Sequence, residues 1–479
     1  MNPHYVPPPE PWTTAWPALP ALLMVAIGLW GCRRRIRPDR WMWGVLALAL
    51  LVRVVALPSW EHQYDGHEAD YRDLLLGDRA LTRGGTLLYP AFQWLHFLAG
   101  KVAPHEAVPL LLSLLAGLLA VGAAGGAVGR LTTPRVGHVT ALALALWGNH
   151  AFWATSAYNV ILPHALAVTA IWALAVWLRG GPAWACGLLA GGAAALAVAT
   201  RVESWLWAPV GLLLVLAHRP RGALKALPGV FLGAGIAGLA TYLIMFPGHT
   251  PGSGQRSLSW AVNRDLLAYW APFDVWWTWL IPLAGFGLGL RRWPKVYAPL
   301  LLLVVGSHAL FATFDDYGFR HLLNALVGVS AALGALVTVR WGWPLLGLAG
   351  LGLVAHTWDV GERYYASEED FADALPDALP RWEVEQLGAC ALICEDGRVV
   401  DEDSQRSHFN LLDPAEAEAM RADAGCIYWV YGLQDHRWSS RAVRDRALRL
   451  LHLYEMTPAA VVSGDQDFVG LVYEVGQRR

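Results

Sequence analysis

The feature that most constrains this chain is a series of long apolar runs that carry almost no charge. A helix needs about 17–25 mostly apolar residues to cross the hydrocarbon core of a bilayer, and several runs in the 479 residues reach that length. Composition agrees, because 56% of the residues are hydrophobic and only 15% are charged, whereas soluble domains average about 25% charged residues. The sequence therefore predicts a polytopic α-helical membrane protein.

Twelve membrane-spanning helices are predicted from these runs. Several are rich in Ala, Gly and Leu, which is typical of membrane helices that pack closely. The two short spans near 203 and 275 are expected to be tilted, re-entrant or differently bounded. The predicted spans are 17–32, 42–58, 107–129, 138–156, 160–178, 183–199, 203–217, 226–246, 275–290, 296–313, 321–339 and 342–358.

Basic residues between the spans indicate the orientation of the chain. Arg33, Arg34 and Arg35 follow the first span, and further Arg or Lys residues follow the third, fifth, seventh, ninth and eleventh. Such residues mark cytoplasmic loops, so the loops 59–106 and 247–274 are predicted outside. The skew to Ala, Gly, Leu, Arg and Trp suggests a GC-rich bacterium. The predicted location is therefore the bacterial inner membrane, with the outer loops in the periplasm.

Charge separates two predicted domains, a transmembrane domain at 1–358 and a soluble external domain at 359–479. The second has 12 Lys and Arg against 24 Asp and Glu, which leaves 24 basic and 14 acidic residues for the first. Strands predicted at 426–431 and 468–473 and a helix at 439–454 indicate a small α/β or α+β domain.

Three cysteines, Cys390, Cys394 and Cys426, lie in the predicted external domain. In an oxidising compartment two of them can form a disulfide, which would leave one thiol over. The alternative is that all three are buried thiols. Cys390 and Cys394 lack the two further ligands of a structural zinc site.

Acidic residues gather where the second predicted span ends. Seven of the 14 acids that precede residue 359 fall within 59–106, and Asp65, Glu68 and Asp70 lie nearest the span. An exposed loop is often simply hydrophilic. A carboxylate at the membrane boundary can instead act as a general base or bind a divalent cation.

This loop resembles the first external loop of the GT-C superfamily membrane glycosyltransferases, especially the protein O-mannosyltransferase and aminoarabinose-transferase (family 39/83-like) branch. Members have an acidic motif, Asp-Glu-x-x-Tyr, then a Gly and a Tyr-Pro-Pro-like stretch. Glu68 and Tyr71 match the motif, His67 stands where Asp is usual, and Tyr89 begins the Tyr-Pro stretch. Asp65, two residues earlier, is the candidate for the missing carboxylate.

Two arginine motifs extend the resemblance. Thr200-Arg201-Val202-Glu203 is similar to a Thr-Arg-x-Glu signature between two mid-chain helices, and Arg320-His321-Leu322-Leu323 is similar to a late Arg-Tyr-Leu-Leu stretch. The resemblance implies that Arg201 and Arg320 bind the donor phosphate. The alternative is that each arginine snorkels or pairs with a carboxylate, for example Arg201 with Glu203.

The resemblance also implies the reaction, which is inverting transfer of a sugar from a polyprenyl-phosphate donor to an acceptor on the external face. Asp65, Glu68 and Asp70 are the candidate catalytic carboxylates, and Tyr71, His67, Glu203 and Tyr89 are candidate cavity residues. The expected partners are the donor, a lipid, glycan or protein acceptor, and membrane lipids. No nucleic-acid motif occurs, and no cofactor is expected.

Three alternatives stay open. A divalent cation could be held by a weaker candidate ligand set, His62, Asp65, His67 and Asp70. A transporter of lipid-linked glycans would be expected to show paired inverted halves, and the acids are instead concentrated in one loop. A non-catalytic scaffold or sensor that works through its acidic C-terminal domain is harder to separate from an enzyme by sequence.

Overall fold

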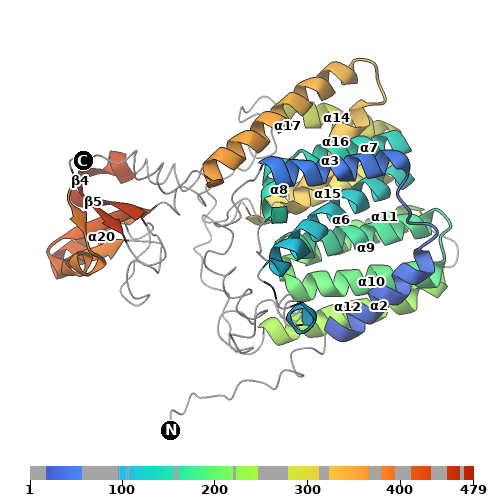
Figure 1. Ribbon diagram of the computed structural model, residues 1–479, viewed down its shortest axis with the longest axis horizontal. Coiled ribbons are helices and arrows are strands. Elements are labelled where there is room, and N and C mark those ends of the chain that lie inside the picture. Colours follow the sequence, from blue (N-terminus) through green and yellow to red (C-terminus); the bar gives the residue numbers. More distant parts are fainter. Residues whose placement is uncertain are drawn as a thin grey trace, which may run out of the picture. The chain divides into compact units, whose positions relative to one another are not determined.

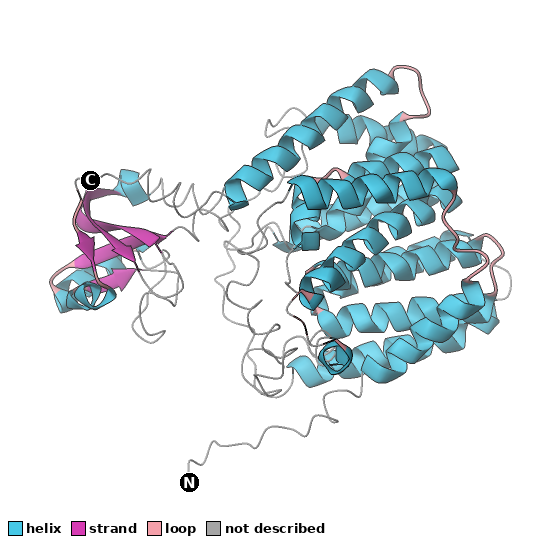
Figure 2. Ribbon diagram, viewed as in Figure 1, coloured by secondary structure: helices cyan, strands magenta, loops and turns pink. Residues whose placement is uncertain are grey.

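The computed structural model describes residues 18–56, 95, 98–103, 105, 107–155, 160–218, 223–245, 279–311, 323–365, 379–393, 411–432, 450–463 and 469–479. The chain divides into two compact units, a helical unit that ends at Val360 and a second unit, Gly361–Arg479. Figure 1 shows the helices of the first unit lying side by side, and Figure 2 shows that the strands belong to the second.

Helices build the first unit, and every predicted span coincides with one of them or with two consecutive ones. Among the described residues, four helical segments are long and apolar enough to cross a membrane, within α6, α9, α10 and α12. The helices are α2 (Ala18–Cys32), α3 (Arg40–Ala56), α6 (Val108–Leu131), α7 (Pro134–Ala145), α8 (Gly148–Thr155), α9 (Ile161–Leu178), α10 (Ala183–Thr200), η3 (Val202–Leu206), α11 (Trp207–His218), α12 (Ala223–Met245), α14 (Leu280–Arg292), α15 (Pro294–Phe311), α16 (Leu323–Leu336) and α17 (Gly342–Tyr365). The polytopic helical prediction is confirmed, while the total of twelve spans stays a prediction.

Helix α10 packs against α2, α9 and α12. Its seam with α12 depends on glycine, because a Cβ added to Gly229 would lie 2.6 Å from the carbonyl carbon of Gly187. A Cβ on Gly191 would likewise meet the backbone of Gly229, and one on Gly233 would meet the backbone of Gly191. Small residues of this kind let membrane helices approach backbone to backbone.

The short basic turns of the helical unit meet at one end. Arg130 at the end of α6 donates to the carbonyl of Arg35 in the α2–α3 turn, and Arg179 after α9 donates to the carbonyl of Arg130 at 2.6 Å. Across the unit, Arg292 donates to the carbonyl of Thr338 at 3.1 Å. We call this the basic end. The grouping agrees with the predicted common face, and its assignment to the cytoplasm stays a prediction.

The predicted span at 138–156 is wrong in one respect, because it is broken into α7 and α8 at Leu146 and Trp147. Side chains from two distant helices bond the carbonyls that the break leaves unpaired. Arg53 of α3 donates to the carbonyl of Ala145 at 3.3 Å, and Thr357 of α17 donates to that of Leu146 at 2.6 Å. A cation is favourable there, because a helix C-terminus carries partial negative charge.

The second unit is built on a five-stranded mixed sheet with the order β1-β4-β5-β3-β2. The outer pairs, β1 with β4 and β2 with β3, are parallel, and the pairs β4 with β5 and β3 with β5 are antiparallel. This confirms the predicted small mixed domain. Its elements are β1 (Arg381–Trp382), η6 (Val384–Ala389), β2 (Ala391–Ile393), α20 (Pro414–Ala424), β3 (Ile427–Gly432), β4 (Tyr454–Ser463) and β5 (Val469–Arg478).

A disulfide joins Cys390 and Cys426, which is one of the two alternatives for the three cysteines of this domain. The two residues directly precede the paired parallel strands β2 and β3, so their Cα atoms lie 5.0 Å apart. Cys394 lies outside the described residues. The predicted helix 439–454 is wrong at its end, because Tyr454 is the first residue of β4 and donates its hydroxyl hydrogen to the carbonyl of Leu411 at 2.6 Å.

Candidate functional site

Arg201 and Glu203 form an ion pair where α10 ends. Arg201 has extended backbone angles, φ −152° and ψ 123°, so the chain leaves α10 there and turns into η3. Its guanidinium Nη2 lies 2.9 Å from Oε1 of Glu203, and its Nε lies 3.3 Å from Oε2. The two side chains are only 8% and 21% exposed. This two-point contact is the strong geometry for an arginine with a carboxylate.

The ion pair lies away from the basic end. Helix α12 begins at the basic end and runs away from it, and the indole N–H of Trp205 in η3 donates to the hydroxyl of Thr241 near the far end of α12 at 3.0 Å. We call this far side the outer end. Arg201 therefore lies at the opposite end of the helical unit from the basic turns, as the predicted orientation of the spans requires.

A second polar group is buried at the outer end, in the last turn of α3. Arg53 is fully buried and donates to the carbonyl of Ala49 at 2.8 Å and to that of Ala145 at 3.3 Å. Its Nη2 also lies 2.8 Å from Nδ1 of His150, the third residue of α8. All of these partners are neutral, and no carboxylate among the described residues bonds Arg53. Within the ranges that the structure describes, the partners of its positive charge are therefore dipoles.

The row of buried polar side chains continues from His150 to two more helices. The ring centroids of His150 and His164 lie 5.5 Å apart, and Nδ1 of His164 lies 3.1 Å from the amide oxygen of Asn324. Within the described part of the chain, Nε of Arg53 and Nε2 of both histidines are buried without a hydrogen-bond partner. The chain Arg53–His150–His164–Asn324 thus joins the outer ends of α3, α8, α9 and α16, where ionisable groups are costly and usually functional.

Comparison with solved structures gives the fold. The chain is similar to ArnT from Cupriavidus metallidurans in the apo state, with a TM-score of 0.50 and 15% identity, covering 90% of this chain and 97% of that one. ArnT is an aminoarabinose transferase of the GT-C superfamily. The chain has the GT-C fold.

Further comparisons add little to this GT-C fold. The same ArnT bound to undecaprenyl phosphate matches with a TM-score of 0.50 and 15% identity, covering 90% of this chain and 98% of that one. An oligosaccharyltransferase of Archaeoglobus fulgidus, in complex with Zn and sulfate, has a TM-score of 0.47 and 13% identity, covering 82% and 68%. No protein-family model matches the sequence. A search of curated proteins also finds no match.

Most of the predicted site residues lie outside the described residues, so their roles stay predictions. Only Arg201 and Glu203 are described, and their ion pair is the contact that the alternative to phosphate binding predicts. Among the described residues no group of three or more His, Cys, Asp or Glu side chains is placed to hold a metal ion. The site residues outside the described ranges are His62, Asp65, His67, Glu68, Asp70, Tyr71, Tyr89 and Arg320.

Sequence reasoning offered His150 and His164 as residues that could line the cavity, with helix-end polar groups as the preferred interpretation, and it gave no role to Arg53 or Asn324. His150 and His164 look like ordinary polar groups at helix ends, and Asn324 carries no sequence signal. Arg53 did carry a signal, because it is the only charged residue between Met42 and Pro58. An arginine isolated in an apolar run is a functional candidate in a membrane helix.

Proposed function

We propose that this protein is an inverting glycosyltransferase that moves a sugar from a polyprenyl-phosphate donor to an acceptor at the outer end of its helical unit. The observation that carries the proposal is the GT-C fold, which matches ArnT over 90% of this chain. The ArnT structure with undecaprenyl phosphate gives a precedent for the type of lipid. Acids and arginines that resemble the motifs of these enzymes occur here at matching places along the chain.

The proposed reaction starts at the acidic loop 59–106. Asp65 or Glu68 takes the proton from the acceptor hydroxyl or amine, with Asp70 as the next candidate base. The deprotonated atom attacks the anomeric carbon from the face opposite the phosphate. The bond between that carbon and the phosphate oxygen breaks, and its electron pair stays on the phosphate. Configuration at the anomeric carbon is thereby inverted.

Arg201 and Arg320 are proposed to stabilise the departing phosphate. A leaving group that is already acidic needs positive charge more than a proton donor, and guanidinium binds phosphate oxygens at two points. Glu203 holds the Arg201 guanidinium by two contacts, 2.9 and 3.3 Å. The proposed role of Glu203 is therefore to fix the direction of the guanidinium until the phosphate shares it. His67, Tyr71 and Tyr89 are proposed to line the cavity.

The outer end is proposed to face the periplasm of a bacterial inner membrane. The Cys390–Cys426 disulfide supports this for the second unit, because disulfides persist in oxidising compartments. The proposed division is a catalytic transmembrane domain at 1–358 and a periplasmic domain at 359–479 that contacts the acceptor. Membrane lipids surround the first domain, and no cofactor is proposed.

The test is donor turnover by the purified full chain in lipid nanodiscs. A panel of undecaprenyl-phosphate-linked pentoses and hexoses is offered together with lipid, glycan and peptide acceptors, and release of undecaprenyl phosphate is measured by mass spectrometry. We expect release with at least one donor, and no loss of activity when EDTA is added. Asp65→Asn or Glu68→Gln should lower the rate by about 10²-fold or more, as loss of a general base does.

Two controls make the result decisive. Asp78→Asn removes another acid from the same loop and should leave the rate unchanged. Full activity in Asp65→Asn, in Glu68→Gln and in the double variant would refute the catalytic role of the loop. Movement of an intact lipid-linked glycan across the membrane of proteoliposomes that carry the same protein, without release of undecaprenyl phosphate, would show a transporter instead. Neither turnover nor movement would indicate a scaffold.

A further inference from the structure

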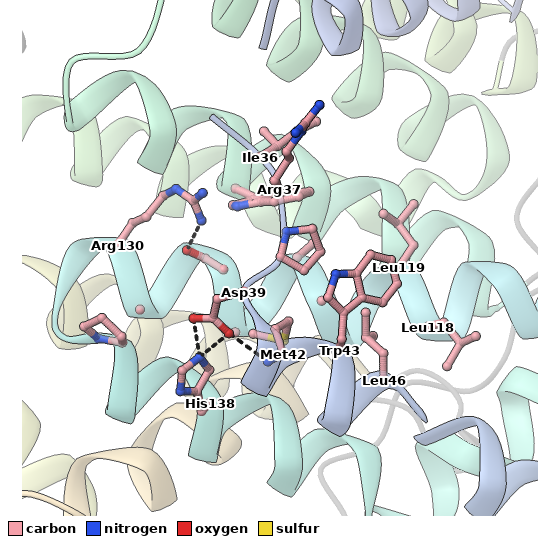
Figure 3. Close-up of a pocket in the computed structure, with 18 of the residues that line it drawn as sticks. Ile36, Arg37, Asp39, Met42, Trp43, Leu46, Leu118, Leu119, Arg130 and His138 are labelled. Atoms are coloured by element: carbon pink, nitrogen blue, oxygen red, sulfur yellow. Dashed lines mark hydrogen bonds and ion pairs between the residues drawn. The ribbon is translucent and has the colours of Figure 1, made fainter. Parts of the chain in front are cut away.

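A cavity of about 730 Å³ opens at the basic end, between α3 and α6. In Figure 3, Arg130, Asp39 and His138 lie on one side of the cavity, and the apolar side chains of Trp43, Leu46, Leu118 and Leu119 lie on the other. The basic end is opposite to the outer end, where the candidate catalytic site is proposed. The cavity therefore needs its own explanation.

The mouth of the cavity is net positive. Arg37 and Arg130 line it, together with one carboxylate, Asp39. That carboxylate is already engaged, because it accepts from the N–H of Met42 at 2.8 Å as the N-cap of α3 and lies 2.9 Å from Nε2 of His138. Partial burial acts to raise the pKa of Asp39, but the contacts with Met42 and His138 prevail and lower it. Asp39 bonds Met42 and His138 and also attracts Arg130 electrostatically, but one carboxylate against two guanidinium groups leaves a net positive charge that attracts an anion.

The position of Arg130 is fixed by its surroundings. It donates to the carbonyl of Gly126 at 3.1 Å and to the carbonyl of Arg35, and its guanidinium carbon lies 5.7 Å from the centre of the Trp172 ring. An arginine held in this way loses little further freedom when it binds a ligand. Arg37 is exposed in the α2–α3 turn, beside the same mouth.

Below the mouth the cavity is an apolar groove with α3 on one side and α6 on the other. It is lined as far as Leu50 on α3 and Leu118 on α6. From Asp39 to Leu50 a helix rises about 17 Å, close to half of the roughly 30 Å hydrocarbon thickness of a bilayer. The groove thus has the depth of one leaflet. Trp43 is 60% exposed and Leu50 is 40% exposed, so its wall is open to the side.

Glycine keeps the groove hollow. A Cβ added to Gly122 would meet only the side chain of Leu46, at 3.7 Å. The space beside Gly122 is therefore open to a ligand, and a larger side chain can fill it without touching the backbone of another helix.

We propose that this groove binds one anionic phospholipid from the leaflet at the basic end, with its phosphate between Arg37 and Arg130 and one acyl chain along α3 and α6. Basic pockets between membrane helices suit the head groups of such lipids. The one-leaflet depth matches an acyl chain of that leaflet better than a polyprenyl chain. The inference depends on the membrane location and is independent of glycosyl transfer.

The test is native mass spectrometry of the detergent-purified full chain, titrated with phosphatidylglycerol, with phosphatidylcholine and with undecaprenyl phosphate. We expect phosphatidylglycerol to bind more tightly than phosphatidylcholine. Arg37→Gln and Gly122→Leu should each raise the dissociation constant for phosphatidylglycerol by about tenfold, the effect of losing one charged contact or the space for the chain. Neither should change the binding of undecaprenyl phosphate.

Matched controls separate the groove from the rest of the surface. Arg40→Gln removes an exposed arginine that does not line the cavity, and Gly44→Leu adds a side chain to α3 at a glycine with nothing within 4 Å. Both should bind phosphatidylglycerol as the wild type does. The proposal is overturned if Arg37→Gln and Gly122→Leu also bind it as the wild type does. It is equally overturned if these two variants weaken undecaprenyl phosphate instead.

Discussion

Loss of the Cys390–Cys426 disulfide should destabilise the second unit by about 4 kcal/mol. The two cysteines are 36 residues apart in sequence, and closing a loop of that size lowers the conformational entropy of the unfolded chain by about that amount of free energy in the chain-entropy model. The bond joins the starts of two parallel strands, β2 and β3. Without it, that pairing has to close the whole loop by itself.

The measurement is pulse proteolysis of the full chain in detergent across a urea series, followed through a C-terminal epitope tag. For a urea dependence of roughly 1–3 kcal/mol per M, a double Cys390→Ser/Cys426→Ser variant should lower the midpoint by about 1.3–4 M. The matched control is Cys32→Ser/Cys186→Ser. Those two free thiols lie 3.4 Å apart and are buried in the helical unit, so their loss should leave this midpoint unchanged.

Two results would refute the reasoning about the disulfide. Equal midpoints for wild type and the Cys390→Ser/Cys426→Ser variant would mean that the bond does not form or does not restrict the unfolded state. If a membrane-impermeant reductant leaves the bond intact in spheroplasts and opens it only after lysis, the second unit lies on the cytoplasmic side and the proposed periplasmic location is wrong.

Three further predictions concern packing, polarity and pH. Arg53→Met should destabilise the helical unit by about 2–6 kcal/mol, because the carbonyl of Ala145 and Nδ1 of His150 each lose a buried partner, at a cost of about 1–3 kcal/mol each. Thermal melting in detergent measures this destabilisation. Arg34→Met, which changes an exposed arginine, should melt as the wild type does. Gly191→Ala should cost about 1–3 kcal/mol or more through overpacking, whereas Gly235→Ala, with nothing within 4 Å, should not lower the melting temperature. Burial raises the pKa of Tyr454. The contribution of Tyr454 to stability is therefore complete below the unfolded pKa near 10 and is lost as pH rises through the higher folded value. Urea titrations at alkaline pH should show this loss of stability, and the Tyr454→Phe variant should show a smaller loss.

The helices of this protein were predictable because each is built from one apolar run, and the bilayer sets the length of such runs. The break between α7 and α8 was not predictable, because it is stabilised by Arg53 and Thr357 from helices far away in sequence. A single sequence shows that these residues are polar in apolar surroundings. It does not show which carbonyls they bond.

The candidate site shows the same division between local and distant signals. The ion pair between Arg201 and Glu203 was predicted as the alternative to phosphate binding, because the two residues are close in sequence and directly follow the same helix, α10. The chain from Arg53 to Asn324 gathers residues from four helices, so no local motif marks it. The sequence also did not show which cysteines pair, because the pairing of Cys390 with Cys426 depends on the parallel register of β2 and β3.

The glycine seam between α10 and α12 bears on how relatives of this chain can be found. Each of four glycines faces the backbone of the other helix, Gly187 and Gly191 on α10 and Gly229 and Gly233 on α12. Substitution of these glycines by larger residues is therefore disfavoured by steric contact, whichever lipid or sugar the protein binds. Homologues that share no motif in the acidic loop should still carry two glycine pairs of this four-residue spacing, one on each of these helices. Lineages that replace one member should show a smaller residue or a shifted helix opposite it, which makes the seam a marker of descent independent of substrate.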